Sequence, residues 1–380
     1  MKLALVMTND WELFGDGSGD FFEIQYDPTM KLFDLLEKHN AKITLMAECM
    51  QQWEHLKISN NNKKAKDIAN AWENAIRTSL RTGNDVQLHL HPQWTNAKYI
   101  DGHWQLDMKK WSLASLTIKD ISQLIGQGKK YLESILKNDT NEYRCVAFRA
   151  GSYCIQPSKK VLPALISNGF KCDTSVTKGL YAHGLYDFRE AYSSLFPWYI
   201  EDHVNNKADN KTDMIEYPIY SVNKMYSEAV SKYFPKFNNK LAFGVDVPKD
   251  ELDWIKKRDC IKELRYPQQN RYYKKKEKHD FKWYINKFFS DTTIQLDYDY
   301  LPATVFVKIL LNLFNSSELE KFRGMDIVIP VIASGHIKDI HNLNNIENII
   351  VRINQDHKDK IEFMTLTEAI NNINIIQKEM

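Results

Sequence analysis

The stretch KLALVMTNDWE, from Lys2 to Glu12, joins an uninterrupted apolar run to two carboxylates. The run from Leu3 to Met7 lacks the alternation of a half-exposed strand and is typical of a strand that is buried on both faces. Asp10 and Glu12 follow it directly, ahead of a glycine-rich segment, and in α/β folds the chemistry lies at this carboxyl end of the strands. Taken alone, the two residues are more typical of loop carboxylates that form turn hydrogen bonds.

Strands alternate with helices along most of the chain. We expect strands at 2–8, 41–46, 85–91, 144–149, 170–172, 214–219, 325–333 and 361–364, and helices at 28–39, 63–81, 117–136, 157–168, 301–322, 345–354 and from 365 onward. This alternation predicts a parallel sheet, and seven or eight such units suit a closed barrel better than an open sheet. The predicted fold is therefore α/β, a deformed (β/α)7-8 barrel in a single domain over 1–380, with a long insertion at 220–291 before the last strands.

The composition is that of a soluble globular protein, with 43% hydrophobic and 26% charged residues. A net charge of +2 gives no strong attraction to nucleic acid or to an anionic membrane. The five cysteines contain no CxxC pair, which argues against a zinc–thiolate site and fits free thiols in a reducing compartment. The first apolar run is too short for a signal peptide and no stretch reaches the ~18 residues of a membrane span, so we expect a cytoplasmic protein.

The insertion carries two basic runs, KKR at 256–258 and RYYKKKEK at 271–278. One interpretation is a surface that contacts phosphate groups of a nucleotide or a lipid headgroup, and the more ordinary one is a solvated basic face. A nucleic-acid-binding protein that uses this Lys- and Tyr-rich segment is a separate function class, and the near-neutral net charge argues against it.

Residues capable of catalysis or metal binding follow several of the predicted strands. They are Asp10 and Glu12 after the first strand, His89 and His91 at the end of the third, Arg149, Ser152 and Tyr153 after the fourth, Asp173 after the fifth, and His336 after the seventh. Parallel strands end at the same edge of a sheet, so we expect these side chains to meet there. His89 and His91 share one face of a strand, and with a neighbouring carboxylate they predict a three-ligand site for a divalent metal. For a histidine alone, a satisfied position in the core would be the simpler interpretation.

The first two motifs resemble those of the NodB-homology polysaccharide deacetylases, which are carbohydrate esterase family four and its relatives. The family opens with Thr-Phe-Asp-Asp or Asp-x-Asp, and TNDWE at 8–12 is similar to it. By this resemblance Asp10 matches the catalytic base, and Glu12 takes the place of a metal-binding acid. The second motif, His-(Ser/Thr)-x-x-His, resembles HLHPQW at 89–94, in which the first histidine is displaced to His89 and Gln87 occupies its usual spacing.

Three further segments resemble family motifs in the same order. FRAGSY at 148–153 is similar to Arg-x-Pro-(Phe/Tyr), although the proline is absent, and Asp173 matches the acid that orients the motif's arginine. SGH at 334–336 resembles the last motif, and EFMTLTE at 362–368 resembles the closing strand–helix junction. The resemblance covers 1–175, the strand near 215, and 325–380, while the insertion matches nothing in the family.

The resemblance implies a metal-dependent deacetylase, a hydrolase that cleaves the amide of an N-acetylated sugar. Asp10 would take a proton from water, Arg149 held by Asp173 would orient Asp10, and His336 would protonate the departing amine. The metal ligands would be Glu12, His89 and His91, with zinc as the first expectation and nickel, cobalt or manganese as alternatives.

Four further residues complete the site that the resemblance implies. A backbone N–H near Ser152 or Tyr153 would hold the oxyanion. Trp11, Trp94 and Tyr153 would stack on a sugar ring, although packing in the core explains such aromatic residues equally well. The expected substrate is a cytosolic nucleotide-sugar or a lipid-linked intermediate of surface-polysaccharide assembly, whose phosphates the basic insertion would contact.

Two alternatives stay open at this point. The same fold could hydrolyse a non-sugar C–N bond, as allantoinase-like relatives of the family do. A non-catalytic carbohydrate-binding homologue is the other, and it is favoured by the displaced His89 and by glutamate rather than aspartate at position 12.

Overall fold

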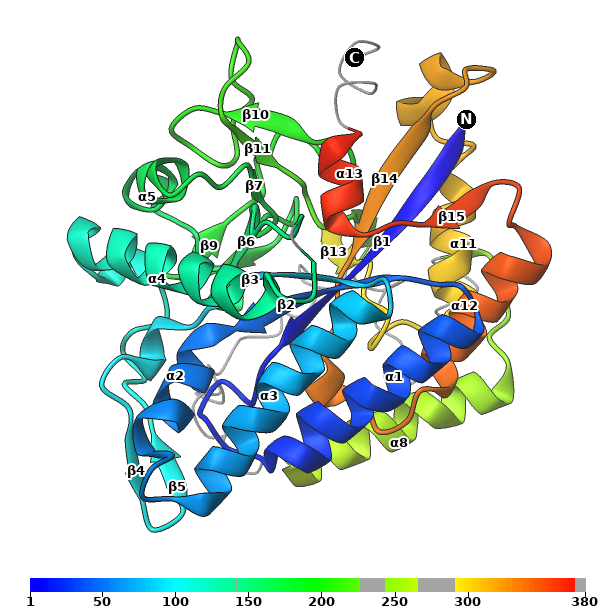
Figure 1. The fold of residues 1–380 in the computed structure, drawn as a ribbon. Coiled ribbons are helices and arrows are strands. Elements are labelled where there is room, and N and C mark those ends of the chain that lie inside the picture. The colour runs from blue at the N-terminus through cyan, green and yellow to red at the C-terminus, as the bar shows by residue number, and fades with distance from the viewer. Residues whose placement is uncertain (141, 226–242, 266–290, 373–380) are drawn as a thin grey trace, which may run out of the picture.

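A curled β-sheet of nine strands forms the centre of the computed structural model, which describes residues 1–140, 142–225, 243–265 and 291–372 (Figure 1). Its strands are β1 (Lys2–Trp11), β2 (Ile43–Glu48), β3 (Asp85–Leu90), β6 (Ala147–Ala150), β7 (Cys172–Asp173), β10 (Trp198–Ile200), β11 (Met214–Glu216), β14 (Val328–Ala333) and β15 (Ile361–Phe363). They lie in the order β10-β11-β7-β6-β3-β2-β1-β14, and β15 pairs with the first half of β1. Every neighbouring pair is parallel except β10 and β11.

The two sides of the sheet meet and close an irregular barrel. Ile219, just beyond β11, forms a parallel bridge with Ile332 of β14. The backbone N–H of Tyr220 donates to the carbonyl of Ile332 at 2.9 Å. The strands β1, β2, β3, β6, β7, β11 and β14 therefore form a ring, with β10 and β15 attached outside it. The predicted α/β fold, a deformed (β/α) barrel, is confirmed.

Strand β1 is the central strand because its side chains are apolar on both faces. Residues 3–7 are completely buried, with β14 on one side and with β15 and then β2 on the other. The strand continues to Trp11, three residues past its predicted end at Thr8. Asp10 therefore lies in the strand itself and not in a loop. Its position is fixed because it pairs opposite Met46 of β2.

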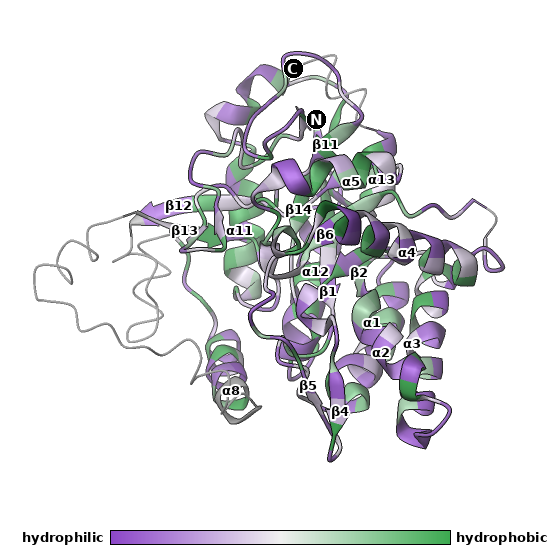
Figure 2. Cartoon of the chain, turned by 90° about the vertical axis from the view of Figure 1, so that its left-hand side faces the viewer, coloured by the Kyte–Doolittle hydropathy of each residue, from purple (hydrophilic) through white to green (hydrophobic). Residues whose placement is uncertain are grey.

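Helices surround the barrel and turn their apolar sides toward it. They are α1 (Asp27–Lys38), α2 (Cys49–Ile58), α3 (Lys63–Arg81), α4 (Ile118–Leu136), α5 (Leu162–Ser167), α11 (Ala303–Leu313), α12 (Asn344–Asp356) and α13 (Leu366–Asn371). In α3, Ile68, Trp72 and Ile76 recur at helical spacing and are buried. Figure 2 shows the same division, with apolar residues gathered toward the strands and hydrophilic residues on the outer helix faces.

Three helical segments differ from the sequence-based prediction. Helix α2 begins immediately after β2, where no helix was expected, and the side chain of Glu48 accepts hydrogen bonds from its first turn. The segment predicted as helical over 157–168 forms a 3₁₀ turn and the shorter α5, which begins only at Leu162. The segment over 301–322 divides into α11 and a 3₁₀ helix at Ser317–Phe322.

Helix α8 (Lys249–Arg265) of the insertion packs against the segments that follow β13 (Asp291–Gln295) and β14. β12 (Ser221–Met225) and β13 pair antiparallel and project from the barrel (Figure 2). Helix α8 is tied to the barrel by Arg258, whose Nη1 donates to the carbonyl of Tyr300 at 2.6 Å. Arg258 is buried, so one residue of the first basic run does not face solvent. The second run, 271–278, lies outside the described residues, and the domain division with an insertion at 220–291 stays a prediction.

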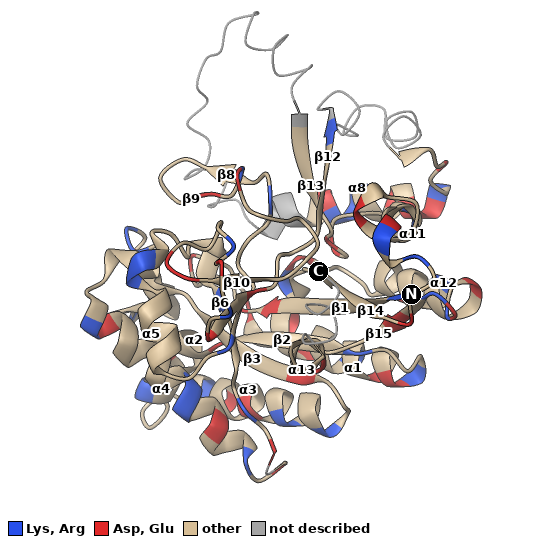
Figure 3. Ribbon diagram, turned by 90° about the horizontal axis from the view of Figure 1, so that it is seen from above, with Lys and Arg blue, Asp and Glu red and all other residues tan. Residues whose placement is uncertain are grey.

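The charges of the described residues are spread over the outside of the molecule. Figure 3 shows acidic and basic residues mixed along the outer helices, such as α1, α3 and α12. Each of the five cysteines is a free thiol. Within the described ranges, no helix is both long enough and apolar enough to cross a bilayer.

Candidate active site

The predicted site residues meet at the carboxyl ends of the barrel strands. In the sheet, Glu48 of β2 lies opposite His89 of β3, which in turn lies opposite Arg149 of β6. On the other side of β2, β1 supplies Asp10 and the residues that follow it. Strands in parallel register bring their last side chains to the same level, so residues far apart in sequence become neighbours.

Two histidines and Glu12 form a compact buried cluster. Glu12 Oε2 lies 2.5 Å from His91 Nε2 and 3.5 Å from His89 Nε2. The two Nε2 atoms are 3.1 Å apart. His89 Nδ1 donates to the carbonyl of Arg149 at 2.9 Å, so its Nε2 carries the lone pair that points into the cluster. His91 Nδ1 lies 2.7 Å from Gln93 Nε2, which fixes the orientation of this ring. The three predicted ligands are therefore brought together.

Glu48 is a fourth member of this cluster, and the sequence-based prediction did not include it. The side chains of Glu12, Glu48, His89 and His91 each offer one donor atom, and these atoms all lie within 4.8 Å of one another. Glu48 Oε2 is buried and has no hydrogen-bond partner among the residues that the structure describes. Burial raises the pKa of Glu48 to about 8, with Glu12 adding to the rise and His91 opposing it. The signal that could have found it is the one used elsewhere, a polar residue directly after an apolar strand.

Lys338 was also not predicted as part of the site. Its Nζ binds Glu12 Oε1 and donates to the carbonyl of Leu13 at 3.2 Å. Burial alone would raise the pKa of Glu12, but His91 and Lys338 together hold this pKa well below its ordinary value. Glu12 is therefore an ionised carboxylate with a histidine on one oxygen and an ammonium group on the other.

The donor set of the cluster fits a divalent metal ion. Imidazole nitrogen and carboxylate oxygen are the usual ligands of zinc and of other first-row dications. The ring nitrogens of His89 and His91 face each other at short range, and the same cluster contains a buried carboxylate oxygen without a partner among the described residues. A bound cation would satisfy these polar atoms. Glu12, His89 and His91 could therefore hold such an ion as predicted.

Asp10 is held by Arg149 beside this cluster. Arg149 Nη1 donates to Asp10 Oδ1 at 2.7 Å, and both side chains are buried. The guanidinium is fixed by Thr174, whose carbonyl accepts from Nε at 2.8 Å and whose Oγ1 accepts from Nη2 at 3.2 Å. Burial would raise the pKa of Asp10, but Arg149, His89 and His336 hold it well below the ordinary value. Asp10 is therefore ionised, as a proton acceptor must be.

Asp173 forms different hydrogen bonds from the one predicted for it. It accepts from the backbone N–H and from Oγ of Ser175, at 3.1 and 2.8 Å. The hydrogen bonds that the structure gives Arg149 go to Asp10 and Thr174, and Asp173 influences the guanidinium only through its charge. The orienting contact that was expected from Asp173 is made by its neighbour Thr174.

His336 lies on the opposite side of Asp10 from Arg149. Its Nε2 is 3.5 Å from Asp10 Oδ2, and its Nδ1 is 3.5 Å from Asp299 Oδ2. Its backbone N–H also donates to Asp299 Oδ2, at 2.5 Å. Burial lowers the pKa of His336, but Asp10 and Asp299 together raise it well above its ordinary value. Asp299, which the sequence-based prediction missed, lies in the segment DYD at 297–299 that precedes α11.

The loop that carries His336 is locked against the end of β1. The carbonyl of Gly335 accepts from the backbone N–H of Asp10 at 3.0 Å. Tyr298 lies under the loop and donates its hydroxyl to the carbonyl of Thr8 at 2.9 Å. A Cβ atom at Gly335 would come within 2.2 Å of the Tyr298 ring, so this position requires glycine. The loop therefore has little freedom to move His336 away from Asp10.

The loop after β6 covers His91 and presents Tyr153. A Cβ atom on Gly151 would lie 2.7 Å from the His91 ring, so the loop passes directly over that ring. Ser152 and Tyr153 have φ values of 52° and 58°, an unusual conformation for residues other than glycine. The hydroxyl of Tyr153 accepts from Gln295 Nε2 at 3.0 Å. The predicted residues Ser152 and Tyr153 are thus close to the cluster.

The two predicted tryptophans lie in the core. Trp11 is completely buried on the face of β1 opposite to Asp10, where its Nε1 donates to Thr29 Oγ1 at 2.8 Å. Its ring packs against Trp72 of α3 with 5.4 Å between centroids. Trp94 is only 2% exposed and packs against Trp104. Packing in the core, which the sequence left open for these aromatic residues, is what the structure shows for both.

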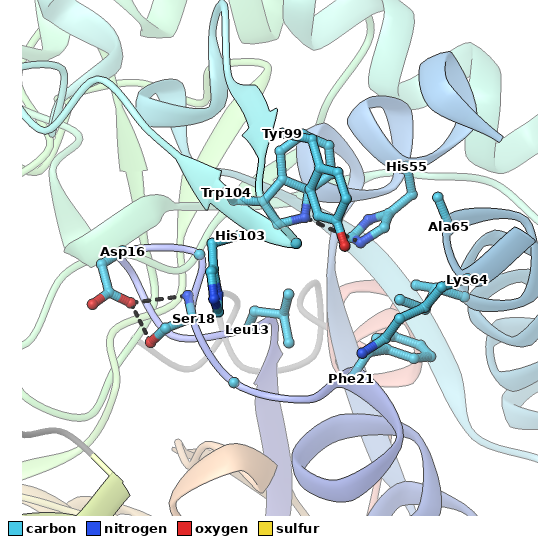
Figure 4. A pocket seen from close by; sticks show the side chains of 14 residues that line it. Leu13, Asp16, Ser18, Phe21, His55, Lys64, Ala65, Tyr99, His103 and Trp104 are labelled. Atoms are coloured by element: carbon cyan, nitrogen blue, oxygen red, sulfur yellow. Dashed lines mark hydrogen bonds between the residues drawn. The ribbon is translucent and has the colours of Figure 1, made fainter. Parts of the chain in front are cut away.

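A cavity of about 520 Å³ lies beside the segment that follows Glu12. Its walls come from the 16–19 loop, from α2 and α3, and from the hairpin of β4 (Lys98–Ile100) and β5 (His103–Gln105). Figure 4 shows Tyr99 and Trp104 on one side and Lys64 and Phe21 on another. None of these residues was predicted as part of a site. The helix that carries Lys64 was predicted, whereas the hairpin and α2 were not expected from the sequence.

No family model matches the sequence, and no curated protein matches it. Among solved structures, the "putative polysaccharide deacetylase" from Mycobacterium smegmatis is 10% identical, with a TM-score of 0.46 over 99% of this chain and 91% of that one. Puue Allantoinase is 9% identical, with a TM-score of 0.39 over 98% and 90%. A GH57-type branching enzyme from Pyrococcus horikoshii is 10% identical, with a TM-score of 0.46 over 98% and 70%. These similar structures are described as a polysaccharide deacetylase, an allantoinase and a branching enzyme.

Proposed function

We propose that the chain is a metal-dependent de-N-acylase, a hydrolase that cleaves a linear amide C–N bond of an N-acetylated sugar. The observation that carries the proposal is Asp10, an ionised and buried carboxylate between Arg149 and a positively charged His336. A proton acceptor and a proton donor at one point, beside a cluster fit for a metal, are the groups that amide hydrolysis requires.

The water-activating half of the reaction belongs to Asp10. When bound, a divalent ion held by Glu12, His89 and His91 would polarise the water and the acyl carbonyl. Asp10 Oδ1 binds Arg149, so Oδ2, which lies 3.5 Å from His336 Nε2, is the oxygen that would accept the proton of the attacking water. Arg149 keeps the carboxylate ionised and fixed in one orientation.

The leaving-group half belongs to His336. The oxygen of water bonds to the acyl carbon, the C–N bond then breaks, and His336 supplies the proton that turns the nitrogen into a free amine. The charge of Asp10 and Asp299 keeps His336 protonated before this step. Asp299 touches neither water nor substrate in this scheme, and it acts by positioning His336.

The sugar is expected beside Tyr153. Of the three aromatic residues predicted to stack on it, Tyr153 is partly exposed while Trp11 and Trp94 are buried. Backbone N–H groups near Ser152 or Tyr153 remain the proposed oxyanion donors. A cytosolic nucleotide-sugar or lipid-linked substrate remains a prediction. Phosphate contacts from the insertion also remain a prediction, because 271–278 lies outside the described residues.

The same groups would serve a hydrolase of a non-sugar C–N bond equally well, so substrate screening must separate the two. A non-catalytic sugar-binding homologue is less consistent with the site. Such a protein would have no use for a buried Asp10–Arg149 pair with a charged histidine on its second oxygen.

The test combines metal analysis with a product assay. The purified protein is expected to hold about one divalent ion per chain and to release acetate from N-acetylated sugar nucleotides, while His336→Gln lowers turnover by about 10²–10³-fold. Release of product from allantoin but not from sugars would favour the non-sugar alternative. A metal-free wild-type protein that binds saccharides without turnover would contradict the proposal.

A further inference from the structure

We propose that Glu48 is a fourth protein ligand of the metal centre, which makes it a site of two histidines and two carboxylates. This inference rests on the metal-dependent function proposed above. Glu48 is completely buried, and its Oε2 has no hydrogen-bond partner within the described part of the chain. A buried carboxylate oxygen without a partner is costly, and such atoms in native proteins usually serve a bound ion, a water or a catalytic role.

The other oxygen of Glu48 explains why the carboxylate points into the cluster. Oε1 accepts from the backbone N–H of Met50 at 2.7 Å and from that of Gln51 at 3.4 Å, which makes Glu48 the N-cap of α2. The cap fixes the carboxylate at the level of His89, its partner in the strand register. One oxygen therefore has a structural role and the other is without a partner in the described ranges, in a carboxylate that belongs to the same cluster as His89 and His91.

The charges at the site support a second carboxylate. Lys338 binds Glu12 Oε1 and offsets the negative charge of that residue. Histidines bind a metal as neutral imidazoles, so beside the Glu12–Lys338 pair the cluster without Glu48 would have almost no net charge to offset a buried dication. Buried charges require compensation, and Glu48 is the group within reach that can supply it.

The donor atoms need only a small movement to reach a common ion. Atoms held about 2.1 Å from one metal lie no more than about 4.2 Å apart. The four donors already lie within 4.8 Å of one another, so the widest pair would have to close by about half an ångström. Side chains of glutamate and histidine make such movements by small torsional changes.

Four protein ligands restrict the kind of metal. A four-coordinate zinc ion would have no position left for water or for the acyl carbonyl, whereas catalytic zinc sites usually use three protein ligands. Ions that accept five or six ligands, such as Mn²⁺, Fe²⁺, Co²⁺ or Ni²⁺, would keep positions open for both. We therefore expect the centre to prefer one of these ions over zinc in its active form.

The test compares Glu48→Gln with Glu216→Gln in the full chain. Glutamine at 48 keeps an oxygen for the α2 cap but removes the negative charge. Glu216 is the matched control, since it is also completely buried and its Oε1 accepts from the backbone N–H of Val176 at 3.0 Å, outside the metal cluster. Binding of Co²⁺ and Mn²⁺ to the metal-free proteins is measured by calorimetry, and folding by circular dichroism.

Glu48→Gln is expected to weaken metal binding by about 100-fold or more, and Glu216→Gln by less than about threefold. Wild-type protein loaded with Co²⁺ should show the weak visible absorption of a five- or six-coordinate ion. Unchanged affinity and spectrum in Glu48→Gln would reduce Glu48 to a helix cap and overturn the inference, while leaving the proposed function intact. Failure of the wild type to bind any divalent ion would instead contradict both.

A second measurement covers the case in which Glu48→Gln does not fold. Crystals of the wild-type protein soaked in Mn²⁺ locate the ion by its anomalous scattering. A peak within coordination distance of Glu48 Oε2 supports the inference. A peak bound by Glu12, His89 and His91 alone, with Glu48 turned away, overturns it.

Discussion

Asp10 lies near the end of β1 and Glu12 directly after it, yet their surroundings give the two carboxylates different chemistry. Asp10 is bonded to Arg149, a permanent cation fixed by Thr174, and it faces His336. Glu12 faces two imidazole nitrogens, which are metal ligands when they are neutral. Both carboxylates are ionised, so the difference lies in the neighbours. The guanidinium of Arg149 binds one oxygen of Asp10, and the other oxygen can accept a proton. The two imidazoles beside Glu12 can instead bind a metal ion together with that carboxylate.

Removal of the metal ion should have the largest effect on turnover. A chelator is expected to reduce turnover to background, and an added dication should restore it. Glu12→Gln should show the same loss, because an amide is a poor substitute for an anionic ligand and Lys338 would lose its counter-ion. Metal content measured by mass spectrometry checks this. Full activity in a Glu12→Gln protein that holds no metal would show that Glu12 is not part of a working metal centre.

Asp10→Asn should affect chemistry without affecting the metal. Loss of the proton acceptor is expected to lower kcat by about 10²–10⁴-fold, whereas metal stoichiometry should remain as in the wild type. The buried Arg149 loses its partner, so the free energy of unfolding should also fall, by up to about 3–5 kcal/mol. Steady-state kinetics, metal analysis and denaturant unfolding measure the three quantities. Loss of metal in Asp10→Asn would mean that the two carboxylates share one role.

Asp299→Asn should move the pH dependence of activity while leaving the metal side unchanged. In the wild type, the raised pKa of His336 keeps the general acid protonated well above pH 6.5, so activity should fall only at alkaline pH. Because the pKa of Asp10 is well below 3.8, its protonation should limit activity only at strongly acid pH. Without the charge of Asp299 the pKa of His336 falls, and the alkaline limb should shift to lower pH.

A profile of kcat/KM against pH checks the Asp299 prediction. At a pH below the shifted limb, Asp299→Asn should retain activity within about tenfold of the wild type. An equal loss at every pH, with no shift, would indicate that Asp299 only supports the fold of the loop around His336.

The smallest effect on activity is expected from a substitution of Trp11, which lies on the face of β1 opposite to Asp10. Trp11→Phe leaves an aromatic ring in the core but loses the hydrogen bond to Thr29, so the free energy of unfolding should fall by about 1–2 kcal/mol. KM and kcat should stay within about threefold of the wild type, because Trp11 faces away from Asp10. Thermal unfolding and kinetics measure both, and Tyr153→Ala, which should raise KM, is the matched comparison. A large rise in KM for Trp11→Phe would place this residue near the substrate after all.

Most of the fold and part of the site could be predicted from local patterns. The apolar run at 3–7 and the regular alternation of strands and helices lead directly to a parallel barrel, and the spacing of His89 and His91 leads to a shared face. Asp173 shows the limit of such reasoning. Its position after a strand was predicted, but the contact with Arg149 comes from Thr174, since a shift of one residue at a strand end turns a different side chain toward the neighbour.

Glu48 shows a different limit. It ends an apolar strand as the other site residues do, but no helix was expected after it, and its capping role gave no sign in the sequence. Asp299 and Lys338 were missed because each acts through a partner in another part of the chain. Lys338 lies only two residues after the predicted His336, but nothing in the sequence shows that its side chain reaches Glu12.

Local patterns were enough to predict which segments become strands, which strand the barrel is built around, and that carboxylates, imidazoles and a guanidinium lie at one edge. These properties depend on local periodicity and on the geometry of parallel strands. Which of the charged side chains meet could be seen only in the folded barrel. Lys338 binds Glu12 although the two residues are 326 positions apart in the chain. Because Glu12 is buried, this ion pair helps to keep its carboxylate ionised. Such contacts depend on how the whole barrel packs, and no local pattern encodes them.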